Sequence, residues 1–242
     1  MESNIDNNAS LYTDKDSNFE LAYELSERNF SHSELLKLLK NGNIVEKQIA
    51  ALKFDLVENF DDAKALLDNL TGCDGKIRET ISMKINNILQ NNESARKIFA
   101  EIAADKFADA TIDINANICR LIVDSANFLI NYKVFSNIYT SKILLFANEA
   151  LNELDKFIFR DKKYVINKQI FKLYWCLEAL STFYIYINED ILDKILTKCA
   201  MQSEYTIREK VAKIIVNSSK FDTIKEQLLN DENYYVKEIL HH

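Results

Sequence analysis

The chain of 242 residues contains no proline and only three glycines. Proline breaks helices, and glycine supplies the positive φ angles of tight hairpin turns, so the scarcity of both leaves long helices uninterrupted and disfavours a fold of β-hairpins. Three glycines are also too few for a glycine-rich loop that cradles phosphate or a dinucleotide. Composition therefore predicts an all-α protein without the common nucleotide-binding loops.

Histidine and paired cysteines are scarce as well. Apart from the last two positions, the only histidine is His32, which lies inside the capping-box pattern Ser31 to Glu34. The four cysteines are far apart and none forms a C-x-x-C pair, which argues against a zinc site and predicts reduced, buried thiols. We therefore expect a non-enzymatic protein with no catalytic residues, no metal and no cofactor.

Targeting and membrane signals are missing from the sequence. Residues 1–18 are rich in Asn, Asp and Ser, which predicts a disordered N-terminal segment followed by a single domain over 19–242. There is no basic segment followed by an apolar run, and the most apolar stretch, Leu173 to Ile187, is interrupted by Glu178. We expect a cytoplasmic protein that does not contact a membrane.

A short phrase recurs six times along the chain. It consists of a β-branched apolar residue, polar or charged residues, and a second apolar residue four positions on. Each copy follows another amphipathic segment, as Glu204 to Val216 follows Glu189 to Ala200. The copies are spaced by about 29 to 48 residues, the period of stacked helical hairpins. They begin at Val45, Ile77, Ile118, Ile166, Ile207 and Val236.

Three copies resemble the HEAT repeat, in which a polar turn precedes Val or Ile and then Arg or Lys. These copies are Asp74 to Arg78, Glu204 to Arg208 and Asn233 to Lys237; in the other three the basic residue is displaced. The resemblance implies a right-handed α-solenoid of about five to six hairpins. Residues 131–141 fit less well, and we expect a short extra helix or an insertion there.

The first and second helices of the repeats differ in charge. The second-helix segments carry 14 Lys or Arg against 9 Asp or Glu, although the whole chain has a net charge of −7. Second helices line one side of a helical solenoid, so we predict a basic groove that binds an acidic peptide or protein segment. The residues expected to contact the partner are Arg78, Arg120, Lys168, Lys172, Trp175 and Arg208.

Several alternatives stay open at this point. The basic residues, with Lys84 and Lys213, could instead form a ladder of ion pairs between repeats. Nucleic acid is a second possible partner, because some DNA-repair glycosylases have a HEAT-like fold, but an acidic chain is a poor counterion for phosphate. The aromatic residues around Trp175 could be core rather than surface. The acidic row at Glu101, Asp105, Asp109 and Asp113 could hold a cation or form a solvated face.

Overall fold

The computed structural model describes residues 18–156 and 163–241, which contain helices and no strand. The described residues form two compact units, which divide between Ala95 and Arg96. The predicted disorder over 1–18 falls on residues outside the described part, apart from Asn18. The single domain over 19–242 stays a prediction.

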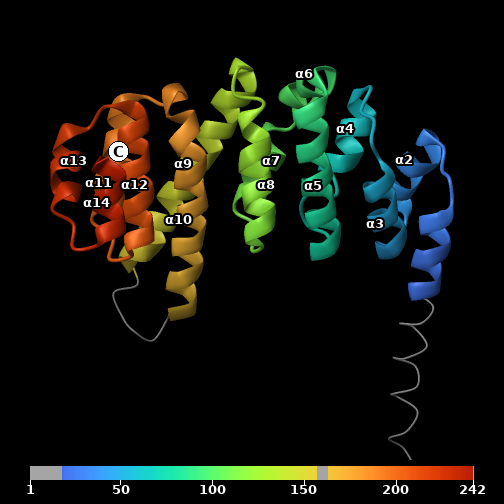
Figure 1. Cartoon of the computed structure of the whole chain (residues 1–242), viewed down its shortest axis with the longest axis horizontal. Coiled ribbons are helices and arrows are strands. Elements are labelled where there is room, and N and C mark those ends of the chain that lie inside the picture. Colours follow the sequence, from blue (N-terminus) through green and yellow to red (C-terminus); the bar gives the residue numbers. More distant parts are fainter. Residues whose placement is uncertain (1–17, 157–162, 242) are drawn as a thin grey trace, which may run out of the picture. The chain divides into compact units, whose positions relative to one another are not determined.

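The first unit contains two stacked hairpins (Figure 1). Residues 18–27 are helical and precede them. Helix α2 packs on both α3 and α4, and α3 packs on α5, so first helices lie against first helices and second helices against second. Capping boxes at Ser31 and Asn43 begin α2 and α3. The bounds are α2 His32–Asn41, α3 Ile44–Lys53, α4 Phe60–Leu67 and α5 Gly75–Asn91.

The second unit continues the same arrangement. Its first helices α7, α9, α11 and α13 pack in that order, and so do its second helices α8, α10, α12 and α14. Helix α6 contains the boundary between the units. The bounds are α6 Glu93–Ile102, α7 Ala104–Thr111, α8 Ala116–Asn127, α9 Lys133–Lys156, α10 Lys163–Phe183, η2 Tyr184–Tyr186, α11 Glu189–Ala200, α12 Tyr205–Ser218, α13 Asp222–Leu229 and α14 Tyr234–His241.

The prediction of an all-α fold of stacked helical hairpins is confirmed by the helix order and packing within each unit. Of the two alternatives expected for 131–141, a short extra helix or an insertion, the separate helix is wrong. Helix α9 runs without a break from Lys133, because Phe135, Tyr139 and Ile143 recur every four residues and all three are buried. No helix in the described part of the chain combines the length and apolar character that crossing a membrane requires.

Aromatic rings anchor α9 and α10 in the second unit. Tyr139 stacks on Phe135 at 5.5 Å between centroids and meets Phe183 edge-on at 5.1 Å. The Tyr139 hydroxyl shares a hydrogen bond of 2.8 Å with the hydroxyl of Thr111 on α7. Burial raises the pKa of Tyr139 well above its ordinary value, so the phenol stays neutral. These contacts hold α10 in place from its C-terminal half.

Candidate functional site

A pocket of about 450 Å³ lies against the N-terminal half of α10. The ends of two neighbouring second helices, α8 and α12, form its sides. Figure 1 shows the first turns of α10 extending beyond the ends of these neighbours. The lining residues are Ala116 from α8, Asn167, Ile170, Phe171, Tyr174 and Trp175 from α10, and Glu204 and Thr206 at the start of α12.

The helical period explains why α10 presents this surface. Asn167, Phe171 and Tyr174 are spaced by three or four residues, which places them on one face of the helix. Residues on the opposite side, among them Leu173 and Leu177, are fully buried in the core of the unit. One face of α10 is therefore fixed by packing, and the other carries half-buried aromatic rings.

Trp175 is the central aromatic residue of the pocket. Its ring lies 5.3 Å from Tyr174 and 6.3 Å from Phe171 between centroids, nearly perpendicular to both. Its indole Nε1 is buried and has no hydrogen-bond partner among the described residues. A buried donor without an acceptor costs about 1–3 kcal/mol. The pocket therefore has a polar group that an incoming acceptor could satisfy if the rings adjust.

A charged network borders the pocket beyond Tyr174. The ammonium of Lys210 lies 4.5 Å from the centre of the Tyr174 ring. Glu178 forms an ion pair with Lys210 at 2.7 Å and accepts a hydrogen bond from Lys213 at 2.6 Å. Burial alone would lower the pKa of Lys210, but its hydrogen bonds with Glu178 and Tyr174 outweigh burial, and its pKa lies above the ordinary value. Lys210 therefore stays charged and holds the Tyr174 ring in place.

Three of the predicted contact residues are engaged within the fold. Arg208 donates to both carboxylate oxygens of Asp231 at 2.6 and 2.9 Å, and Lys172 donates to Glu149 at 2.8 Å. In the first unit, Arg78 donates to the carbonyl oxygen of Cys73. The pair of Arg208 with Asp231 agrees with the ladder alternative, as do the pairs of Lys84 with Asp55 and of Lys213 with Glu178, whereas Lys172 and Glu149 belong to the same repeat.

Two other predicted residues, Arg120 and Lys168, are exposed beside the pocket. Arg120 lies one turn after Ala116 on α8, and Lys168 follows Asn167 on α10. Neither forms an ion pair with another described residue. The structure therefore brings Arg120, Lys168 and Trp175 to one surface, and it engages Lys172 and Arg208 elsewhere.

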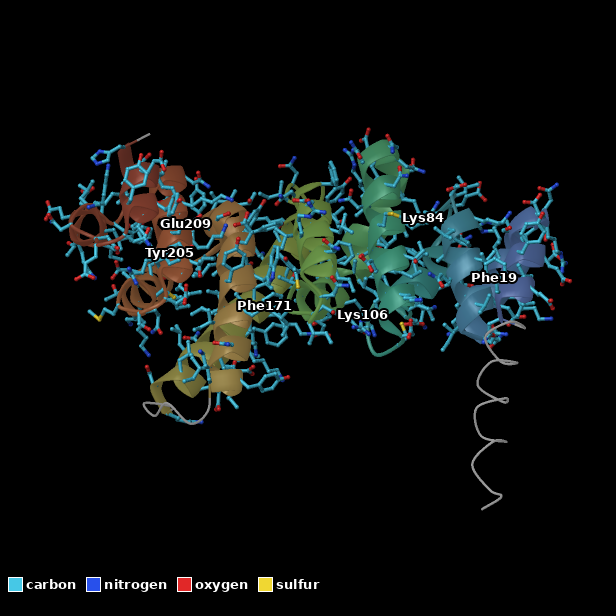
Figure 2. The ribbon with its side chains drawn as sticks, turned by 60° about the horizontal axis from the view of Figure 1, so that its bottom comes forward. Phe19, Lys84, Lys106, Phe171, Tyr205 and Glu209 are labelled. Carbon is cyan, nitrogen blue, oxygen red and sulfur yellow. The ribbon has the colours of Figure 1, made fainter. Side chains whose placement is uncertain are left out.

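Sequence reasoning missed a set of tyrosines next to the pocket. Tyr205 precedes the pocket residue Thr206, and its ring lies 6.4 Å from that of Tyr235 on α14. Tyr234 lies 5.8 Å from Tyr235, and all three side chains are exposed. Figure 2 shows Tyr205 on α12, the helix next to the one that carries Phe171. The available signal was a tyrosine one or two positions before two copies of the repeated phrase, at Ile207 and Val236.

The acidic row does not form as predicted. Helix α6 ends at Ile102 and α7 begins at Ala104, so the four carboxylates do not share one continuous helix. Lys142 of α9 pairs with Asp105 at 3.3 Å and with Asp109 at 3.0 Å. The described residues contain no group of three or more metal-ligating side chains.

His32 and the four cysteines are involved in packing within the fold. His32 Nε2 lies 2.9 Å from Oδ1 of the buried Asp62 and links α2 to α4. Cys119, Cys176 and Cys199 are buried, and Cys73 is half-buried. Burial raises the pKa of all four thiols, to about 12 for Cys119 and Cys199, which makes them poor nucleophiles.

No protein-family model and no curated protein matches the chain. Among solved structures, it is similar to the archaeal HEAT-like repeats protein from Thermococcus onnurineus NA1, with a TM-score of 0.48 and 14% identity over 88% of this chain and 79% of that one. It is also similar to an engineered protein, with a TM-score of 0.48 and 11% identity over 88% of this chain and 94% of that one. Neither similarity says what this chain binds.

Proposed function

We propose that the chain is a non-enzymatic scaffold that holds a segment of another protein on the surface formed by α8, α10 and α12. The observation that carries this proposal is the aromatic pocket around Trp175. Trp and Tyr dominate the binding energy of protein interfaces because they bury a large area with few rotatable bonds. What marks this pocket is its apolar aromatic lining, which is typical of surfaces that bind a partner side chain.

The packing of α10 supports a binding role over a purely structural one. Its inner face already meets the apolar core, so the pocket rings are not needed to anchor the helix. Covering the apolar area that they leave exposed would contribute about 25 cal/mol per Å². A partner side chain that enters the pocket would gain this contribution.

Fewer basic residues support the proposal than the basic groove predicted from the sequence contains. Arg120 and Lys168 are exposed beside the pocket and can attract acidic groups of a partner. Charges at the rim of an interface act mainly on the association rate. Lys172 is held by Glu149 and lies 4.8 Å from the Phe146 ring, so reversing its charge would damage the fold locally.

The test is selection of displayed random peptides of about a dozen residues on the full chain, followed by binding measured through tryptophan fluorescence. Trp175 is the only tryptophan, so its emission reports on the pocket alone. We expect the selected peptides to change this emission and to bind Phe171→Ala about tenfold more weakly. Tyr164→Ala is the matched control, because Tyr164 lies on the same helix, is 81% exposed and does not line the pocket.

Three outcomes would contradict the proposal. One is that selection yields no binding peptide. Another is that peptides bind Phe171→Ala as well as the unmodified chain and leave the emission unchanged. The third is that a single-stranded or duplex oligonucleotide binds more tightly than the peptides, with the steep salt dependence of phosphate contacts. A melting curve of Phe171→Ala separates loss of binding from loss of folding.

A further inference from the structure

We infer, on the basis of the proposed function, that the occupant is an extended segment of a partner protein with an acidic end, an apolar anchor and a basic end. The anchor enters the pocket at Trp175. The acidic end lies near α8 and the first half of α10, and the basic end lies over α12 and α14.

The tyrosines beside the pocket extend the surface that the segment can contact. The pocket belongs to α8, α10 and the start of α12, and Tyr205 stands next to it on α12. The ring contact of Tyr205 with Tyr235 continues the aromatic surface onto α14. Half-buried rings on α10 and exposed rings on α12 and α14 therefore lie on three consecutive second helices at the level where α12 and α14 begin. We call this surface, formed by Phe171, Tyr174, Trp175, Tyr205, Tyr234 and Tyr235, the aromatic row.

The aromatic row runs across the helices, which favours an extended ligand. Packed helices lie about 8–10 Å apart, so a segment that reaches from α10 to α14 must span roughly 16–20 Å. An extended chain covers that distance with about six residues at 3.3 Å each. Its side chains alternate between the row and the solvent, so every second residue can contact a ring.

Charges at the two ends of the aromatic row have opposite signs. Arg120 and Lys168 are exposed at the α8 and α10 end, where the exposed Asp124, one turn after Arg120, offsets part of their charge. At the other end, Arg208 and Asp231 neutralise each other, and Lys210 and Lys213 are both paired with Glu178 of α10. The remaining cation of α12 and α14, Lys237, is outnumbered by carboxylates. These carboxylates are Glu204, Glu209, Glu232 and Glu238. Electrostatic complementarity across an interface fixes the register of a bound segment, so the segment is expected to carry opposite charges at its two ends.

Glu209 is the residue best placed to test the basic end. It follows Tyr205 by one turn of α12 and lies close to it in Figure 2. Lys168 is its counterpart at the acidic end. Both are surface positions, so charge reversal at either one leaves the hydrophobic core of the unit intact.

The experiment repeats the peptide selection on three chains: the unmodified protein, Lys168→Glu and Glu209→Lys. Peptides selected on the unmodified protein should carry Asp or Glu on one side of an apolar residue and Lys or Arg on the other. Lys168→Glu should replace the acidic preference by a basic one and leave the basic end unchanged. Glu209→Lys should do the reverse, replacing the basic preference by an acidic one.

The outcomes separate this inference from the proposed function. Pocket-dependent peptides that lack the two opposite charges, or that respond in the same way to both reversals, would overturn the inference and leave the scaffold proposal standing. Peptides that bind as helices, shown by circular dichroism of the complex, would also overturn it. Peptides whose binding ignores Phe171→Ala would contradict the scaffold proposal itself.

Discussion

Gly42 shows how a single position sets the geometry of a hairpin. It joins α2 to α3, and a Cβ atom there would lie 2.5 Å from the carbonyl oxygen of Leu38 and 2.9 Å from Cβ of Glu46. Its φ of −69° is ordinary, so the requirement is close approach and not an unusual backbone angle. Glu46 completes the capping box of α3, which ties the turn to the helix start.

At this scale we predict that Gly42→Ala lowers the free energy of unfolding by about 1–3 kcal/mol, the usual cost of overpacking. Gly75→Ala is the matched control. Gly75 is the first residue of α5 and has no atom within 4 Å of an added Cβ. Alanine there should stabilise the chain by about 0.4–1 kcal/mol, because it reduces the entropy of the unfolded state. Urea titration measures both, and equal shifts of the two midpoints would contradict the argument.

Between elements, a bidentate ion pair of the second unit joins α12 to the connection before α14. Arg208 is 15% exposed and Asp231 6% exposed, and Arg208 also donates to the carbonyl oxygens of Gln202 and Ser203. Asp231 in turn accepts from the backbone N–H of Asn233 at 2.8 Å. The hydrogen bonds of Arg208 are the main reason that the pKa of Asp231 lies below its ordinary value.

This pKa gives a prediction about pH. A carboxyl with a lowered folded-state pKa stabilises the fold above its unfolded pKa of about 3.9, and this contribution disappears as pH falls through the lower folded value. Asp231→Asn should therefore cost about 1–3 kcal/mol at neutral pH and progressively less below about pH 4. Lys220→Gln is the control, since its pair with Glu189 is mostly exposed and contributes little. A cost for Asp231→Asn that stays constant down to about pH 2 would contradict the assignment.

Helix periodicity in the sequence predicts most elements, and the failures have local causes. The expected bounds of α11 agree with the structure, because apolar spacing and Asn188 at the N-cap both mark them. The break between α6 and α7 at Ala103 was missed, since neither proline nor glycine stands there. At the candidate site, Lys172 and Arg208 resembled free cations because their partners, Glu149 and Asp231, approach only through packing of neighbouring helices.

At the scale of the whole molecule, the division into two units raises the question of whether they unfold together or separately. In stacked repeats each hairpin contacts only its neighbours, so a destabilising substitution weakens its own hairpin and the adjacent ones most. We predict that Leu66→Ala in the first unit increases amide hydrogen exchange in Met1–Ala95 more than in Arg96–His242. Leu180→Ala should show the opposite pattern. Each removes a fully buried side chain and should cost about 2–5 kcal/mol. Uniform loss of protection from either substitution would instead support the single domain predicted from the sequence.

The burial of the cysteines has a practical consequence. Cys73 is the only one of the four that is not fully enclosed, and it lies in the first unit, whereas the single tryptophan lies in the second. A naphthalene dye at alkaline pH would attach to Cys73 alone, since the other three thiols are shielded from the reagent, and the absorption of the dye overlaps tryptophan emission. The native chain thus contains a fluorescence donor, Trp175, and an attachment site for an acceptor, Cys73. A change in the efficiency of energy transfer on binding would report that a partner changes the distance between the two units.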